Sequence, residues 1–441
     1  MSSIWEYYNE KSILMTGGSG FLGTALVHRL LTSTSASRIY VVCRGGAKKL
    51  EARWKEWMPS DTVRRMCDSN RLIVLDGDIL LPNLGLSKFD LDILRHDTEI
   101  VIHAASSINL GKRLDRVFNS IVEASQMMFN IALSCPNFER FIYVSTAYSN
   151  AHLYSQSPGS DIQVEEKIYY LKGESDVLEE LDQVRKHGTS KAYQKENFPW
   201  SYAYAKNLSE RLLLHRFSEI GAKEKLLIVR PSVIGPSLRL PFPGYIMPMS
   251  SPCTMSIAIA SLYPFRTLKI ATLMAEPELD VHIDEVPVDV VVDRLLCHLA
   301  MGTYGCFHAV SGVDSRIDYN CFVKNLGIVR RFPWGVQPVW LKEDWKSRKQ
   351  FWASRIYAII GVSFAFSDDR TIALSKRLSD QEKVDLQLFS GCNFDVASRA
   401  ESIRYVMDQF AGQSWLAWMI VWLLYSDLGK GNSHRWRSVK L

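Results

Sequence analysis

A glycine-rich turn between a short apolar run and an apolar helical pattern constrains the fold of this 441-residue chain more than any other feature. The turn lies in ILMTGGSGFLGTALVHRLL, residues 13–31. After Thr16, glycines recur at every third position as Gly17, Gly20 and Gly23. They provide backbone without Cβ where the chain reverses and where a diphosphate must approach. A strand before the turn and a helix after it predict a dinucleotide site, with the diphosphate at the positive end of the helix.

Further apolar runs alternate with helical patterns along the chain. This alternation predicts an α/β fold with a doubly wound parallel sheet, covered by helices on both faces. The carboxyl ends of parallel strands meet at one edge, so polar residues that follow these strands are expected to share one site. The predicted strands after the first are residues 38–44, 71–79, 99–106, 140–146, 225–232 and 305–311.

The second predicted strand ends on Arg44, with Lys48 and Lys49 just behind it. An acidic residue near this position binds the ribose hydroxyls of NAD, whereas an arginine suits the 2′-phosphate of NADP. The sequence therefore favours NADPH over NAD, the alternative being that Arg44 is only a solvated strand end. The predicted cofactor contacts are Thr16, Gly17, Ser19, Gly20, Phe21, Leu22, Gly23, Arg44, Asp78, Ile79, Ala104, Ala105, Tyr202, Lys206, Pro231 and Val233. His103 is expected to be a packed histidine rather than a catalyst.

The reacting groups are predicted in SYAYAK, residues 201–206, where Tyr202 and Lys206 share one helical face. A phenol with an ordinary pKa of about 10 is a poor acid at neutral pH, and the Lys206 ammonium is expected to lower that value. Thr146, preferred over Ser145, follows the fifth strand and is expected to bond the substrate carbonyl oxygen. Thr146, Tyr202 and Lys206 are thus the predicted catalytic residues. The alternative is a tyrosine at a helix start and a surface lysine.

Composition excludes several other functions. The net charge of +5 is spread over 52 basic and 47 acidic residues, too diffuse to predict binding to nucleic acid. The eight cysteines show no metal-binding spacing, so no metal is expected, and they read as free thiols of a reducing compartment. The N-terminus lacks a signal-peptide core, and the apolar run 415–425 is shorter than the ~18 residues of a spanning helix. A cytoplasmic location is expected.

The sequence also predicts how the chain is divided. Residues 1–332 are expected to form the cofactor-binding reductase domain, with a charged helical insertion at 151–199 and a substrate lobe at about 236–300. Residues 333–441, which are rich in tryptophan, are expected to form a small, mainly helical C-terminal domain. The oligomeric state cannot be read from the sequence.

A series of motifs resembles the reductase domain of the fatty acyl-CoA reductases, which are extended short-chain dehydrogenases related to thioester reductase domains. The motifs are TGGSGFLG, GDILLPNLGLS, VIHAAS, YVSTAYSN, VEEKIY, SYAYAK, VRPSVIGPS, PFPG and VPVDVVVD, in that order. The similarity covers residues 12–311. It implies NADPH-dependent reduction of a long-chain acyl-CoA, usually to the alcohol, with Thr146, Tyr202 and Lys206 matching the catalytic hydroxyl, tyrosine and lysine of the family.

Two positions depart from the family pattern. Ile121 stands where the family usually has an asparagine, and Ala205 replaces the common Ser or Thr before the lysine. Neither change removes a reacting group.

The C-terminal part resembles the family only loosely. Trp415, Trp418 and Trp422 fall on one helical face, and a basic tail follows them. Peripheral contact with an anionic membrane through residues 415–441 is one expectation, and a helix packed on its own domain is the other. The last three residues, VKL, are one substitution from the peroxisomal signal SKL.

The expected reaction reduces the acyl-CoA thioester to an aldehyde, and a second NADPH takes the aldehyde to the alcohol. Rival interpretations within this fold are a thioester reductase that releases the aldehyde from CoA or a carrier protein, and a sugar-nucleotide epimerase or hydroxysteroid dehydrogenase. The non-enzyme alternative is an NADP-sensing binding module.

Overall fold

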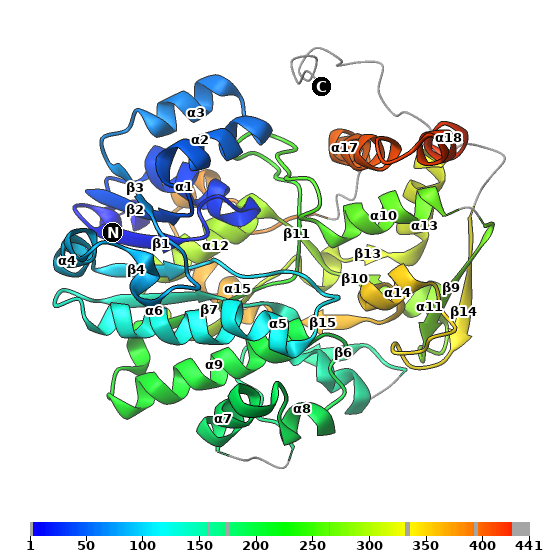
Figure 1. The fold of residues 1–441 in the computed structure, drawn as a ribbon, viewed down its shortest axis with the longest axis horizontal. Helices are drawn as coiled ribbons and strands as arrows, with labels where there is room; N and C mark the ends of the chain where they lie inside the picture. The colour runs from blue at the N-terminus through cyan, green and yellow to red at the C-terminus, as the bar shows by residue number, and fades with distance from the viewer. Residues whose placement is uncertain are drawn as a thin grey trace.

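A seven-stranded parallel sheet lies at the centre of the computed structural model, which describes residues 3–156, 159–172, 176–263, 265–330, 336–391 and 396–425. The strand order is β12-β7-β5-β4-β1-β2-β3, and helices cover both faces (Figure 1). Every strand expected from the sequence is present, so the predicted fold class is confirmed. The strands are β1 Ser12–Thr16, β2 Arg38–Cys43, β3 Leu72–Asp76, β4 Ile100–His103, β5 Arg140–Val144, β7 Leu226–Pro231 and β12 Gly305–Ala309.

Side-chain alternation along each strand supplies two separate hydrophobic cores. In β1, Ile13 and Met15 point into one core, and Leu14 points into the other. Strands buried on both faces need apolar residues at nearly every position, which is why they read as unbroken apolar runs. The first core is closed by α1 Phe21–Ser33, α2 Gly46–Trp57, α3 Ser60–Cys67 and α12 Val288–Ala300. The second is closed by α4 Lys88–Asp97, α6 Ala124–Leu133 and α9 Ser201–Glu219.

The strand order reverses direction between β1 and β4. From β1 the chain proceeds outward to β2 and β3 and then returns to β4 on the other side. In open parallel sheets this switch point leaves a crevice at the carboxyl ends of the strands, where ligands bind. In this chain the switch point lies between the glycine turn after β1 and the end of β4.

The charged insertion after β5 is held against the sheet by a buried ion pair. It comprises η4 Ala147–Gln156, β6 Ile162–Val164, α7 Val177–His187 and α8 Lys191–Lys195. Arg211 on α9 donates from its two terminal nitrogens to the carboxylate of Glu180 on α7, at 2.7 and 2.9 Å. Both side chains are buried, so α7 is fixed on the helix that carries Tyr202 and Lys206.

The remaining helices and strands lie outside the seven-stranded sheet. They are α5 Leu114–Phe118, β8 Val233–Gly235, α10 Pro252–Leu262, β9 Thr267–Thr272, α11 Pro277–Asp280, β10 His282–Ile283, β11 Glu285–Pro287, β13 Ile317–Asp318, α13 Tyr319–Val329, β14 Gln337–Lys342, α14 Trp352–Ile356, β15 Phe364–Phe366, α15 Asp369–Ser375, α16 Asp380–Asp385, α17 Ala400–Ala411 and α18 Trp415–Leu424. Short 3-10 turns are η1 Ile4–Tyr8, η2 Pro82–Gly85, η5 Lys223–Lys225, η6 Val313–Ser315, η7 Ala358–Gly361 and η8 Ala397–Arg399, and η3 Asn119–Glu123 is a π-helical turn.

The C-terminal part contributes strands to earlier parts of the chain. Strand β14 pairs in parallel with β9, and β15 pairs in parallel with β6. The part beyond residue 332 is therefore helical for the most part but is joined to the rest by backbone hydrogen bonds. The division of the chain at residue 332 stays a prediction.

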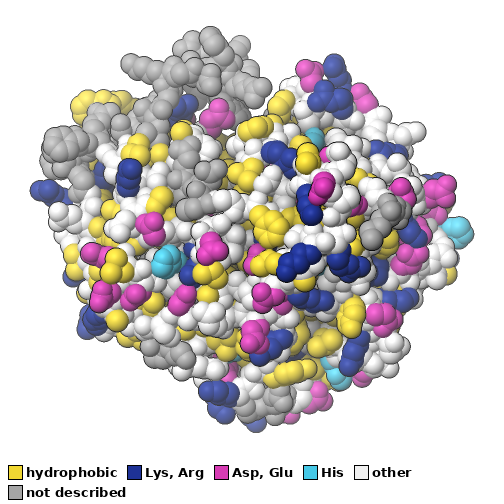
Figure 2. All heavy atoms as spheres, turned by 180° about the vertical axis from the view of Figure 1, so that it is seen from behind, with side chains coloured by type: hydrophobic (Ala, Val, Ile, Leu, Met, Phe, Trp, Pro, Cys, Tyr) yellow, Lys and Arg dark blue, Asp and Glu magenta, His cyan; other side chains and the backbone are white. Residues whose placement is uncertain are grey.

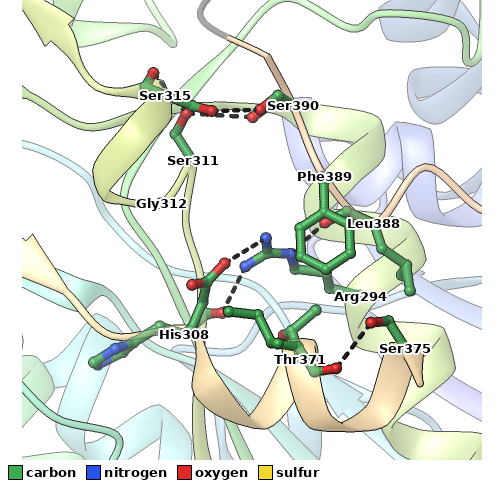
Figure 3. A network of polar contacts seen from close by, with 12 residues as sticks. Arg294, His308, Ser311, Gly312, Ser315, Thr371, Ser375, Leu388, Phe389 and Ser390 are labelled. Carbon is green, nitrogen blue, oxygen red and sulfur yellow. Dashed lines mark hydrogen bonds and ion pairs between the residues drawn. The ribbon is translucent and has the colours of Figure 1, made fainter. Parts of the chain in front are cut away.

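A buried arginine also fastens the C-terminal part to the sheet domain (Figure 3). Arg294, on α12, donates to the carbonyl of Leu388 at 2.7 Å, to the carbonyl of His308 at 3.2 Å and to the carboxylate of Asp368 at 2.9 Å. Close by, Ser315 donates to the Ser390 carbonyl at 2.6 Å. The contacts with Asp368, Leu388 and Ser390 join the C-terminal part to α12 and to the turn η6 Val313–Ser315, and the contact with His308 joins α12 to β12.

The surface mixes charges of both signs with apolar side chains, as the rear view in Figure 2 shows. This agrees with the diffuse net charge found in the sequence. Within the described ranges, every helix is too short or too polar to cross a bilayer.

Candidate functional site

The glycine turn packs too closely on its neighbours to tolerate side chains. A Cβ on Gly17 would come 2.7 Å from the Ala105 amide nitrogen, and the backbone at Gly17 has a φ of +84°. A Cβ on Gly23 would come 2.0 Å from the Gly17 carbonyl oxygen. The turn therefore needs glycine where it meets the end of β4 and where α1 approaches it. Ala104 and Ala105 are brought to the turn as predicted.

The start of α1 is open to an anion. Its N-cap residue is Gly20, and no side chain caps the first amides of this 13-residue helix. A Cβ on Gly20 would meet only the Gly17 carbonyl oxygen, at 3.3 Å. Uncapped amides and the helix dipole together suit a diphosphate, so these residues fit a dinucleotide. From behind, the Trp54 indole supports the turn by donating to the Gly18 carbonyl at 3.1 Å.

Thr16 links the turn to β4. Its hydroxyl lies 2.8 Å from His103 Nδ1 and accepts from the Ala105 amide at 3.3 Å. Burial lowers the pKa of His103 to about 3, so the ring is neutral. His103 is a packed histidine, which confirms that interpretation of the sequence.

The residues predicted for the far end of the cofactor meet at the carboxyl ends of β2 and β3. The Arg44 side chain is 71% exposed, and its guanidinium lies 4.0 Å from the Asp78 carboxylate. Asp78 is engaged with its own loop, since it accepts from the Leu80 amide at 3.0 Å. Ile79 packs against the second core. This arrangement leaves the Arg44 guanidinium exposed to solvent and able to contact a phosphate.

Not every predicted contact residue can present its side chain to a cofactor. Phe21 and Leu22 are buried, and the Phe21 ring packs 5.4 Å from the ring of Tyr245. These two residues can contribute only backbone amides at the helix start. Val233 is buried in β8, whereas the Pro231 carbonyl accepts from the Thr146 hydroxyl at 3.3 Å. Ser19 lies beside Cys43 and lowers the pKa of that thiol, which burial raises.

Thr146 and Tyr202 meet where β5 ends and α9 begins. The Thr146 hydroxyl lies close enough to the phenol to act on its pKa, and Thr146 Oγ1 accepts a hydrogen bond from the Tyr148 amide at 3.3 Å. Burial raises the pKa of Tyr202 well above its ordinary value, and the Thr146 hydroxyl counteracts part of the rise. The neighbouring Ser145 hydroxyl is buried with no hydrogen-bond partner among the described residues. The geometry therefore pairs Tyr202 with Thr146, the hydroxyl preferred from the sequence.

Lys206 is buried, with its side chain turned toward β5. Its ammonium donates to the Val144 carbonyl at 2.7 Å and lies 4.7 Å from the centroid of the Tyr143 ring. Burial lowers its pKa to about 7, and Glu210 opposes that shift. The structure corrects the expectation that Lys206 lowers the pKa of Tyr202. The Lys206 ammonium contacts the Val144 carbonyl and the Tyr143 ring. Burial raises the pKa of the Tyr202 phenol.

Tyr143 is a site residue that sequence reasoning missed. It lies on β5 and faces the second core, where its ring lies beneath the Lys206 ammonium and 5.9 Å from the His103 ring. Its position in RFIYVST identifies it only as an inward-facing strand residue. The alternation of β5 could have placed it under α9, but nothing in the sequence indicates a contact with a cation.

A buried polar network behind the site was also missed. The Asn207 side-chain amide donates to the Asn150 side-chain oxygen at 3.3 Å, and Arg211 donates from Nε to the Asn207 side-chain oxygen at 2.9 Å. Because Arg211 also holds Glu180, the network ties η4, α7 and α9 together next to Lys206. Its members lie far apart in the chain, so no local pattern indicates it.

The two departures from the family pattern have local explanations. Ile121 lies in the π-helical turn η3, where its carbonyl accepts from the Ser209 hydroxyl on α9 at 3.4 Å. Thus α9 is held at this point through backbone rather than through a side chain at position 121. Ala205 is fully buried, so a small side chain suits its position.

The second pair with tyrosine–lysine spacing, Tyr7 and Lys11, lies at the opposite edge of the sheet. Lys11 forms ion pairs with Glu99 at 2.8 Å and with Glu139 at 2.5 Å, near the starts of β4 and β5. Cysteines 43, 67, 135, 253, 297 and 306 are free thiols. In the parts of the chain that the structure describes, His, Cys, Asp and Glu side chains form no metal-binding group.

Comparisons with known proteins agree with this geometry. The model of the male sterility protein family matches residues 15–295. The chain is 30% identical over 354 residues to fatty acyl-CoA reductase 1 of Rattus norvegicus, covering 79% of this chain and 64% of that protein. It is 30% identical over 320 residues to fatty acyl-CoA reductase 2 of Homo sapiens, covering 70% of this chain and 57% of that protein. The chain thus spans less than two thirds of the length of these relatives.

Solved structures show the same fold at lower identity. The terminal R domain of the myxalamid PKS-NRPS biosynthetic pathway aligns with a TM-score of 0.58 and 17% identity, over 91% of both chains. DesIV, a dTDP-glucose 4,6-dehydratase from Streptomyces venezuelae, aligns with a TM-score of 0.52 and 15% identity, over 92% of this chain and 99% of that one. These structures confirm the extended short-chain dehydrogenase fold. The chain belongs to the male sterility protein family and is a relative of the fatty acyl-CoA reductases.

Proposed function

We propose that this protein uses NADPH to reduce a long-chain fatty acyl-CoA to the alcohol, by way of the aldehyde. The observation that carries the proposal is that the Thr146 and Tyr202 hydroxyls meet where β5 ends and α9 begins, at the strand edge that also holds the glycine turn. The similarity to proteins named fatty acyl-CoA reductases supports an acyl-CoA as the substrate.

At this edge of the sheet, three groups fit the cofactor. The uncapped amides of α1 would bind the diphosphate. The Arg44 guanidinium would pair with the 2′-phosphate that distinguishes NADPH from NADH. Lys206 would hold the ribose next to the nicotinamide. The hydride comes from the nicotinamide when the cofactor is bound.

Thr146 and Tyr202 would bind the carbonyl oxygen of the thioester between their hydroxyls. Because burial raises the pKa of Tyr202, the phenol stays protonated at neutral pH and keeps a proton to give. As negative charge develops on the substrate oxygen, Tyr202 would donate that proton from its hydroxyl oxygen. The resulting hemithioacetal then loses the CoA thiol to give the aldehyde, and the same hydroxyls serve the second reduction.

The proposal is tested with purified protein, palmitoyl-CoA and NADPH, by following cofactor oxidation and identifying the products. Two NADPH consumed per thioester, with hexadecanol as product, is the expected result. One NADPH per thioester would show a reductase that stops at the aldehyde. Absence of oxidation with any acyl thioester would contradict the proposal.

Replacing the proton donor is the sharper test. Tyr202→Phe should lower kcat/KM by roughly 10²- to 10⁴-fold, with little change in the thermal unfolding midpoint, because the substitution removes only the hydroxyl and keeps the ring. Tyr170→Phe is the matched control, since Tyr170 is an exposed tyrosine in the insertion at residues 151–199. Equal activity of the two variants would remove Tyr202 from the reaction.

Cofactor preference tests the role of Arg44. Arg44→Ser should raise the KM for NADPH by about tenfold to a hundredfold, because a hydrogen bond to a charged group is lost, and should leave the KM for NADH nearly unchanged. Initial rates with both cofactors measure the difference. A similar change in KM for both cofactors would show that Arg44 does not bind the 2′-phosphate.

A further inference from the structure

Helix α18, Trp415–Leu424, presents an apolar surface to solvent. Only Ala417 and Leu424 of its ten residues are buried. Trp415 is 69% exposed, and Trp418 and Trp422 are each 57% exposed. The exposed apolar side chains of this helix are Trp415, Leu416, Trp418, Met419, Trp422 and Leu423. We call these six side chains the α18 outer face.

The outer face is held in place rather than left on a loose end. Helix α18 packs on α17 and on α10 (Figure 1). At the C-terminal end of the helix, Tyr425 pairs through its backbone with Arg330, which follows α13. The Trp418 and Trp422 rings stack with their centroids 6.5 Å apart. The three tryptophans therefore lie on a helix that the rest of the protein holds in place.

A patch of this kind favours one class of partner. Contiguous apolar patches on soluble surfaces mark sites where water is excluded by something else. Tryptophan is enriched where hydrocarbon meets lipid headgroups, because its ring is large and apolar and its N–H needs a polar partner. Three tryptophans on a ten-residue helix that contains no charged residue match that boundary.

The charge of the following sequence gives an independent argument. Residues 426–441, which lie outside the described part of the chain, contain Lys430, Arg435, Arg437 and Lys440 against the single acid Asp427. Basic residues next to a membrane-binding helix are attracted to anionic headgroups. A second protein surface would have no general need for this charge. The combination of tryptophans and basic residues therefore favours an anionic bilayer.

The length of α18 decides whether the helix could span such a bilayer or only lie in its surface. Ten residues at 1.5 Å each make a helix of roughly 15 Å, half of the ~30 Å hydrocarbon core. The helix can therefore lie in the headgroup layer but cannot cross it. The helix α10, on which α18 packs, lines an apolar pocket together with α13, through Ala260, Phe322 and Leu326.

We propose that the α18 outer face docks on the anionic surface of a lipid bilayer and lies in its headgroup region. Docking requires neither turnover nor a bound cofactor, so it stands apart from the proposed reductase activity. The remaining candidates for this face are a second copy of the chain and no partner.

The test uses the full chain and sedimentation with vesicles of phosphatidylcholine, with and without phosphatidylserine. Binding is expected to the vesicles that contain phosphatidylserine, and high salt should weaken it. The double substitution W415D/W418D should reduce the partition coefficient by about tenfold or more, because two large apolar side chains no longer insert into the bilayer. Changing Lys430, Arg435, Arg437 and Lys440 together to glutamine should abolish the preference for phosphatidylserine.

The matched control is Trp352→Asp, because Trp352 is an exposed tryptophan on α14, away from the α18 outer face. It should bind vesicles like the unaltered chain. Unchanged unfolding midpoints would show that both variants are folded. Failure of the unaltered chain to bind either vesicle would overturn the proposal, as would equal binding by W415D/W418D. Self-association in solution that W415D/W418D abolishes, without vesicle binding, would assign the face to a second copy instead.

Discussion

Burial of Lys206 shifts the pKa of its amine, and this shift makes the stability of the protein depend on pH. The pKa of its amine is lowered by burial to about 7, from the ordinary value of 10.5. Between these two values the unfolded chain binds more protons than the folded protein. The free energy of unfolding of the cofactor-free protein should therefore rise with pH from about 7 to about 10.5, by at most about 1.4 kcal/mol per pH unit from this group.

Denaturant unfolding at pH 7 and pH 9 measures that effect. Lys206→Met should remove the contribution, so that the gain in stability on going to pH 9 is smaller in the variant than in the unaltered chain. Lys55, which is exposed and paired with Glu51, provides the control substitution Lys55→Met, which should keep the gain. Identical pH dependence in the Lys206→Met variant would show that the amine is not desolvated.

The sequence indicates which residues gather at one edge of the sheet, but not which groups they contact there. Thr16, Thr146 and Tyr202 follow strands or begin a helix, and the parallel sheet brings such positions to one edge whatever the details of packing. The contact of Lys206 with the Val144 carbonyl and the Tyr143 ring depends on how α9 rests on β5. That depends on packing between distant segments, so the direction of the Tyr202 pKa shift could not be predicted correctly.

At the scale of elements, the link between α7 and α9 depends on one buried ion pair. Arg211→Met would leave the Glu180 carboxylate buried without its cation, although the Tyr204 hydroxyl would still donate to it. Loss of one partner of a buried pair typically costs about 3–5 kcal/mol. We expect a decrease of that size in the free energy of unfolding, measured with urea.

The double substitution E180Q/R211M should recover much of this loss, because the buried charge is removed together with its partner. An exposed pair serves for comparison: Arg64→Met breaks the contact with Asp61, which lies on the surface, and should cost less than about 1 kcal/mol. Equal effects of Arg211→Met and Arg64→Met would mean that the buried pair does not hold the insertion.

Elements of the sheet domain were predictable because each strand carries its own apolar run. Strands β14 and β15 were not predictable, because each finds its partner far away in the sequence, in β9 and β6. QPVWLK and FAF do not indicate strands by themselves. A partner strand with an open edge is what makes them strands, and no local pattern contains that information.

At the scale of the whole molecule, Arg294 joins the C-terminal part to the sheet domain. Arg294→Met would leave the Leu388 and His308 carbonyls without this donor and the Asp368 carboxylate without its cation. The free energy of unfolding should fall by roughly 3–5 kcal/mol. In addition, residues 368–391 should become susceptible to limited proteolysis and should exchange amide hydrogens faster.

The location of the effect matters as much as its size. Faster exchange confined to residues 368–391 would support the role of Arg294 as a fastening between parts of the chain. Uniformly faster exchange over the whole sheet, with no local increase, would show a general loss of stability and would contradict that role.

The pairing of β9 with β14 has a consequence during synthesis on the ribosome. The earlier strand, Thr267–Thr272, leaves the exit tunnel before its partner, Gln337–Lys342, has been translated. Until then its outer edge presents unpaired amides and carbonyls, which is the kind of edge that recruits other chains. A nascent chain of this protein should therefore depend on chaperones in that interval, and a product cut short before residue 337 should aggregate.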